Sequence, residues 1–147
     1  MNVKSLRLII KDLVPIPLPA SGKKFLFNEA VKLKLPSTNY RLLGENLCIN
    51  RDEGTGKCDL WLANPKNKFL VSLDLKVGEI DDLTKQQLLV KQVNKYTGFM
   101  KCYYPMHIVY GLGAYKYPDG VNFIDTLCGD PKHIFEINKL KSVIKSS

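Results

Sequence analysis

The sequence has few residues that bind soft metals and no long apolar run. It contains four cysteines and two histidines among 147 residues. Cys48, Cys58, Cys102 and Cys128 are scattered and form no C-x-x-C pair, which gives little support for zinc or iron–sulfur ligation and, in a reducing compartment, argues against disulfides. No segment approaches the roughly 18–20 apolar residues of a membrane helix, and charges interrupt the first twelve residues too often for a secretory signal. We therefore expect a cytoplasmic protein that does not associate with membranes.

Acidic residues are the minority among the charged ones. Twenty-two Lys and Arg stand against 14 Asp and Glu, which gives a net charge of +8 and a pI near 9.3. Such a surplus suits a polyanionic partner, nucleic acid before membrane, although lysine-rich surfaces also serve solubility alone. With 45% hydrophobic residues and no internal repeat, the whole chain, 1–147, is predicted to form one domain.

Two neighbouring segments, residues 57–63 and 69–77, have the composition of strands joined by a turn. In the second segment the odd-numbered residues are apolar and share one face, which leaves Leu70, Ser72, Asp74 and Lys76 on the other. Apolar residues then recur at helical spacing over residues 81–97, until Gly98, and a strand follows over residues 106–112. The pattern predicts an α/β fold: a mixed central sheet with an antiparallel hairpin and a parallel crossover, flanked by helices.

Residues 23–35 are ambiguous. Asn28 and Glu29 could begin a helix, whereas residues 31–35 alternate like a strand; we favour a helix that contains Glu29. Other expected elements are strands over residues 4–10, 47–49 and 121–127, a polar loop over residues 50–56, and a last helix that begins near Pro131.

The turn of the hairpin sets its register. If the turn is centred between Lys66 and Asn67, Asp59 lies directly opposite Asp74, with Cβ atoms about 5 Å apart. Two opposed carboxylates repel each other, so a shared cation would stabilise them. Because carboxylates are hard oxygen ligands, Mg²⁺ is the first choice. A slip of one residue would turn the two side chains to opposite faces and remove the site.

Asp59 in one strand, followed by Asp74-Leu75-Lys76 near the end of the next, resembles the bipartite motif of the PD-(D/E)XK nuclease superfamily. Cys58 stands where that family often has proline. Downstream, Gln92-Val93-Asn94-Lys95-Tyr96 matches the Q-x-x-x-Y motif of the RecB-type and lambda-exonuclease-like branch. The resemblance covers about residues 25–113. Each motif alone is common in lysine-rich chains, so the order, spacing and strand–turn–strand–helix setting carry the resemblance.

The resemblance implies a restriction-endonuclease-like core that hydrolyses DNA with a divalent cation. It implies that Asp59 and Asp74 bind Mg²⁺ or Mn²⁺, helped by the main-chain carbonyl of Leu75. Lys76 would then orient or activate the attacking water and offset charge on the phosphate. Taken alone, an Asp-x-Lys pair on a strand is also typical of a surface ion pair.

The resemblance also extends to residues outside the two strands. Gln92 and Tyr96, one helical turn apart, would steady the site or contact the DNA backbone. The family often adds an acidic residue from its first helix, for which Glu29 is the better candidate and Glu45 the alternative.

Two classes of function follow from this interpretation. The Q-x-x-x-Y motif favours an exonuclease or an enzyme that processes ends or single strands. The small size also suits a structure-selective endonuclease, such as a Holliday-junction resolvase, which would act as a homodimer. The other class is a basic nucleic-acid-binding protein that kept the fold and lost the chemistry.

Overall fold

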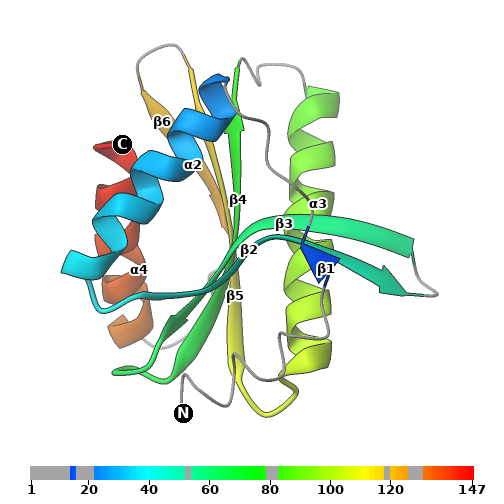
Figure 1. Ribbon diagram of the computed structural model, residues 1–147, viewed down its shortest axis with the longest axis vertical. Helices are drawn as coiled ribbons and strands as arrows, with labels where there is room; N and C mark the ends of the chain where they lie inside the picture. Colours follow the sequence, from blue (N-terminus) through cyan, green and yellow to red (C-terminus); the bar gives the residue numbers. More distant parts are fainter. Residues whose placement is uncertain (1–13, 16–21, 52–53, 79–82, 118–119, 126–130) are drawn as a thin grey trace.

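The computed structural model describes residues 14–15, 22–51, 54–78, 83–117, 120–125 and 131–147 (Figure 1). Its elements are, in chain order, β1 (Val14–Pro15), α2 (Lys23–Lys34), the short 3₁₀ helix η1 (Leu35–Ser37), β2 (Arg41–Arg51), β3 (Gly54–Asn64), β4 (Phe69–Val77), α3 (Leu83–Tyr103), β5 (Ile108–Lys116), β6 (Val121–Asp125) and α4 (Pro131–Lys145). The strands form one sheet in the order β1 to β6. Neighbouring strands are antiparallel except β4 and β5, which are parallel. The predicted α/β class is therefore confirmed.

Helices cover both faces of this sheet, with α2 and α4 on one face and α3 on the other (Figure 1). Strand β4 is central, and its residues from Phe69 to Leu75 are all buried. Phe69 and Leu75 lie in the core cluster that includes residues of α2 and α4. Ser72 faces the other way, because its Oγ lies 2.9 Å from Oγ1 of Thr97 on α3. The expected alternation along this strand is confirmed.

A second core cluster lies between the sheet and α3. It is built around Trp61, which is fully buried and contacts Tyr103 and Tyr104 edge to face. Phe99 and Met100 of α3 complete it. These two residues explain why α3 continues past Gly98, the predicted end, to Tyr103: the last helical turns gain apolar burial against the sheet.

The register of the β3–β4 hairpin agrees with the prediction. Residues 60–64 pair with residues 69–73, from Leu60 opposite Leu73 to Asn64 opposite Phe69. The pairing ends one position before Asp59 and Asp74. Beyond this point β3 leaves β4 and continues with β2 alone (Figure 1). The two aspartates therefore lie at a fork in the sheet rather than in a continuous ladder.

The remaining elements agree with the sequence prediction in part. The ambiguous segment 23–35 is a helix, and α4 begins at Pro131 as predicted. The loop expected over residues 50–56 was wrong, because β2 runs to Arg51 and β3 begins at Gly54, so most of that stretch pairs within a hairpin. The strand expected over residues 4–10 lies outside the described residues. No helix of the described residues is long and apolar enough to cross a membrane.

Candidate functional site

Asp59 is a buried carboxylate that replaces a missing strand partner. Its side chain is 1% exposed. At the fork, the backbone N–H of Leu75 no longer meets a backbone carbonyl of β3 and instead donates to Oδ2 of Asp59 at 2.8 Å. Buried backbone groups require such partners, so Asp59 is part of the fold as well as of the candidate site.

Lys24, in the first turn of α2, supplies the positive charge that faces Asp59. Its Nζ donates to Oδ1 and Oδ2 of Asp59 at 2.8 and 2.7 Å, and to the carbonyl oxygen of Leu75 at 2.5 Å. The ammonium therefore has three oxygens of the fork around it. A helix N-terminus disfavours a cation, and α2 has no acidic residue in its first turn. We infer that Asp59 compensates for this unfavourable position.

Asp74 is the second buried carboxyl of the fork, 3% exposed. Among the described residues, its Oδ2 has no hydrogen-bond partner, and the nearest ion-pair partner is Nζ of Lys76 at 3.6 Å. Burial, together with the hydrogen bond to Asp59 and the charge of Asp59, raises the pKa of Asp74 to about 8. Asp74 is therefore mostly protonated at neutral pH when no metal is bound.

The pKa of Asp59 shifts in the opposite direction. Burial acts to raise the pKa of Asp59, but the hydrogen bond from Asp74 and the charge and hydrogen bond of Lys24 outweigh it, so this pKa is lowered. The two carboxyls thus share one proton, held by Asp74, and Asp59 carries the negative charge. This difference in environment is what separates two chemically identical side chains.

The oxygens at the fork fit a hard cation. Asp59, Asp74 and the carbonyl of Leu75 offer only oxygen, and Oδ2 of Asp74 is buried with no hydrogen bond from any residue that the structure describes. Mg²⁺ often binds through one or two carboxylates and keeps several waters. No group of three or more His, Cys, Asp or Glu side chains comes together in the part of the chain that the structure describes. Within the described part of the chain, two carboxylates and a carbonyl are therefore the protein ligands that this site can supply.

The two candidates for a third acidic residue lie elsewhere. Glu29 and Glu45 both form ion pairs with Lys32, at 2.6 and 2.5 Å. Glu29 follows Lys24 by five positions on α2, which places the two side chains about 140° apart around a helix of 3.6 residues per turn. Because Lys24 points to the fork, Glu29 does not. The structure brings neither glutamate to Asp59 and Asp74.

Lys76 and Gln92 do come together. They line one pocket of about 260 Å³ between the end of β4 and α3, which Lys85 also lines. Gln92 is half-buried, whereas Tyr96, one turn further along α3, is 9% exposed and belongs to the second core cluster. The predicted motif on α3 thus divides into one residue at the pocket and one packed in the core.

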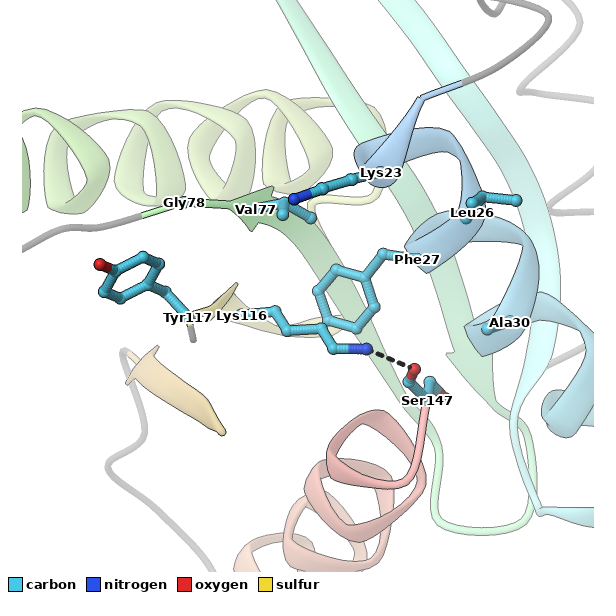
Figure 2. A pocket seen from close by; sticks show the side chains of 9 residues that line it. All are labelled: Lys23, Leu26, Phe27, Ala30, Val77, Gly78, Lys116, Tyr117 and Ser147. Atoms are coloured by element: carbon cyan, nitrogen blue, oxygen red, sulfur yellow. Dashed lines mark hydrogen bonds between the residues drawn. The ribbon is translucent and has the colours of Figure 1, made fainter. Parts of the chain in front are cut away.

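A larger pocket, of about 710 Å³, lies between the start of α2 and the ends of β4 and β5 (Figure 2). Lys23 and Phe27 line it from α2, and Lys116 from β5. Nζ of Lys116 lies 5.7 Å from the centre of the Phe27 ring and donates to the carbonyl oxygen of Ser147 at 3.0 Å. None of the predicted site residues lines this pocket, so size alone does not identify the candidate site.

Lys24 is the site residue that sequence reasoning missed. The available signal was the predicted opposition of Asp59 and Asp74, because two opposed carboxylates are stabilised by a cation nearby. The helix that contains Glu29 also contains Lys24, but sequence alone does not tell which face of that helix points to the strands. The functional interpretation of the fork rests on these residues and their geometry.

Compared with family models, curated proteins and solved structures, the chain matches none of them.

Proposed function

We propose that this protein is a metal-dependent deoxyribonuclease of the PD-(D/E)XK type, built on a restriction-endonuclease-like core. One observation carries the proposal: two buried carboxyls meet at the fork, and Asp59 and the carbonyl of Leu75 already surround a cation, the ammonium of Lys24. Two buried carboxyls repel each other when both are ionised, so the pair needs either a shared proton or a cation. Asp59 also serves the fold through the Leu75 N–H and Lys24, but neither of these contacts needs a second buried carboxyl at Asp74.

Asp59, Asp74 and the carbonyl of Leu75 would hold the ion. When bound, a divalent ion lowers the pKa of a water and stabilises negative charge on the phosphate. Asp74 must release its proton to serve as a ligand, since the protonated carboxyl donates to Asp59. Lys76 lies beside Asp74 and is partly exposed, so its ammonium can orient the attacking water and offset charge on the phosphate.

The surroundings of the site suit a phosphodiester. Lys76 and Lys85 bring two positive charges to one pocket, and the amide of Gln92 adds a hydrogen-bond donor there. A net charge of +8 favours association with DNA in a salt-dependent manner. Within this function we favour an exonuclease or an end- or single-strand-processing enzyme over a dimeric structure-selective endonuclease, because of the Q-x-x-x-Y pattern at Gln92 and Tyr96.

A second candidate is a DNA-binding protein on the same fold without cleavage. The position of Lys24 favours it, because the ammonium already neutralises Asp59 and contacts the Leu75 carbonyl. If that contact were permanent, two of the three ligands for a metal would be unavailable.

Cleavage assays separate the two candidates. The assay compares the wild type with Asp74→Asn and Lys76→Ala. Each protein is incubated with linear duplex, circular duplex or single-stranded DNA, in the presence of Mg²⁺, Mn²⁺ or EDTA. Lys66→Ala is the matched control, because it removes an exposed lysine in the turn at the other end of β4. Metal-dependent cleavage that both site variants lose and the control keeps supports the nuclease. Salt-sensitive binding without cleavage, unchanged in Asp74→Asn, supports the binding protein.

A further inference from the structure

An ammonium lies where the divalent ion of the proposed nuclease would bind. Nζ of Lys24 contacts both carboxylate oxygens of Asp59 and the carbonyl of Leu75 at 2.5–2.8 Å. These are two of the three groups that would hold the ion, and two cations cannot use the same oxygens at once. We propose that Lys24 is an exchangeable internal cation, which a divalent ion must displace from Asp59 and Leu75 in order to bind. This inference rests on the proposed function.

Lys24 is the partner in this contact that can leave. Its side chain is 37% exposed, whereas that of Asp59 is 1% exposed. Asp59 is also held by the Leu75 N–H, so it cannot turn away without breaking a buried hydrogen bond. A lysine has a long flexible stem and a strongly hydrated head group. Exchange therefore moves one side chain of α2 into water and leaves the strands in place.

The contact also explains how the fork is stable without a metal. A buried carboxylate without a counter-charge is strongly destabilising, and Lys24 supplies that charge from the same polypeptide. The same contact opposes metal binding, because only molecules in which Lys24 has left can accept the ion. The apparent dissociation constant is the intrinsic constant divided by the fraction in the open state. Lys24 therefore raises the ion concentration that is needed to fill the site.

The test measures Mn²⁺ binding by the full chain, from the electron paramagnetic resonance signal of free Mn²⁺. It compares the wild type with three variants. Lys24→Met keeps the length of the side chain and removes the charge, whereas Lys24→Arg keeps the charge. Lys23→Met is the control, because Lys23 is the neighbouring exposed lysine and donates none of the three contacts. Because Lys24 is more than one third exposed and water weakens its ion pair, we expect Lys24→Met to bind Mn²⁺ about 2- to 5-fold more tightly than the wild type. Lys23→Met should match the wild type, and Lys24→Arg should not bind more tightly than it.

Thermal unfolding gives a second readout. Lys24→Met should unfold at a lower temperature than the wild type in EDTA and recover more stability than the wild type when Mg²⁺ is added, because the ion then supplies the missing charge. A lysine that only supported the fold would lower stability without raising metal affinity.

The outcomes are distinguishable. Equal or weaker Mn²⁺ affinity in Lys24→Met, with wild-type binding intact, overturns the exchange and leaves the nuclease standing. Absence of Mn²⁺ binding in both proteins, each folded by circular dichroism, overturns the nuclease and the exchange together. Binding by Lys24→Met alone supports the exchange. If Lys24→Met does not fold, ¹⁵N resonance of the lysine ammonium groups in the wild type decides: the Lys24 signal changes on Mg²⁺ addition if exchange occurs, and an unchanged signal overturns it.

Discussion

Replacing either aspartate of the fork by asparagine should change stability in opposite directions when metal is absent. Asp59 carries the negative charge, because its pKa is lowered by Asp74 and Lys24 against the effect of burial. Asp74 carries the proton, because burial and the neighbouring Asp59 raise its pKa to about 8. At pH 7 in EDTA, Asp59→Asn therefore removes a charge, whereas Asp74→Asn replaces one neutral group by another.

The contacts give the magnitudes. Asp59→Asn weakens the bond from the Leu75 N–H, 2.8 Å long, and the two bonds from Lys24. A buried hydrogen bond to a charged group contributes about 1.5–3 kcal/mol. Lys24 is more than one third exposed and can turn to water, so its ion pair adds only about 0–1 kcal/mol. We expect Asp59→Asn to lose about 2–3 kcal/mol of unfolding free energy. Asp74→Asn should be more stable than the wild type at pH 7, because its amide can still donate to Asp59 and folding no longer has to keep a carboxyl protonated.

The pH dependence separates the variants further. The folded-state pKa of Asp74, about 8, lies above its ordinary value of 3.8. Folding therefore favours the protonated carboxyl of Asp74. The protonated form stabilises the folded state fully below pH 3.8, and this stabilisation is lost as the pH rises to about 8. The loss is at most about 1.4 kcal/mol per pH unit. Asp74→Asn lacks this titration, so its advantage over the wild type should grow from pH 4 to pH 8.

Urea unfolding in EDTA, followed by the fluorescence of the buried Trp61, the single tryptophan, measures all three proteins. Equal destabilisation of Asp74→Asn and Asp59→Asn at pH 7 would contradict this assignment of charge and proton. That result would mean that the two carboxyls are equivalent and that the proton does not reside on Asp74.

Three further predictions concern single residues. If the protein is the proposed nuclease, Lys76→Ala should slow Mg²⁺-dependent DNA cleavage at least about 100-fold and leave DNA affinity nearly unchanged. Single-turnover kinetics measure the cleavage rate, and fluorescence anisotropy measures the affinity. An unchanged cleavage rate would show that Lys76 takes no part in the reaction. Gly113→Ala should lower the free energy of unfolding, measured in urea, by about 1–3 kcal/mol, because a Cβ there would lie 2.8 Å from Cγ2 of Val93 on α3. Gly98→Ala should raise the free energy of unfolding by about 0.5–1 kcal/mol in the same assay. Gly98 is exposed within α3, and an added Cβ would meet no atom of the described residues within 4 Å outside its own helix backbone and chain neighbours. A lower free energy of unfolding in this variant would contradict this account of the helix.

The parts of the fold that local patterns determine could be predicted from the sequence. The alternation of residues 69–77 was sufficient to identify β4 and the faces of its side chains. The turn between Asn64 and Phe69 was sufficient to set the register, and that register brought Asp59 and Asp74 together. The helical spacing after residue 81 predicted α3 and the parallel crossover.

The parts that depend on tertiary contacts could not be predicted. Gly98 signals a helix end locally, but the burial of Phe99 and Met100 extends α3 past it. The polar residues at 50–56 suggest a loop, yet β2 and β3 pair through most of them. Lys24 reaches the fork only because α2 lies at one particular rotation over the sheet, and neither propensity nor period gives that rotation.

The fork gives a structural reason for the position of the candidate site. On the side of β4 that faces β3, the N–H and the carbonyl of Leu75 lose their strand partners where β3 leaves. Buried backbone groups must be satisfied, and here Asp59 accepts from the N–H while Lys24 donates to the carbonyl.

Neutral side chains could satisfy the same two backbone groups without the desolvation penalty of buried charges. Asparagine at position 59 could accept from the N–H, and a hydroxyl could donate to the carbonyl. The fork instead has two carboxyls, and one of them has an oxygen without a hydrogen bond among the described residues. Backbone satisfaction alone requires neither the second carboxyl nor that oxygen, whereas the proposed divalent cation would use both. The proposed ion that exchanges with Lys24 would give the second carboxyl a role, which the needs of the sheet do not.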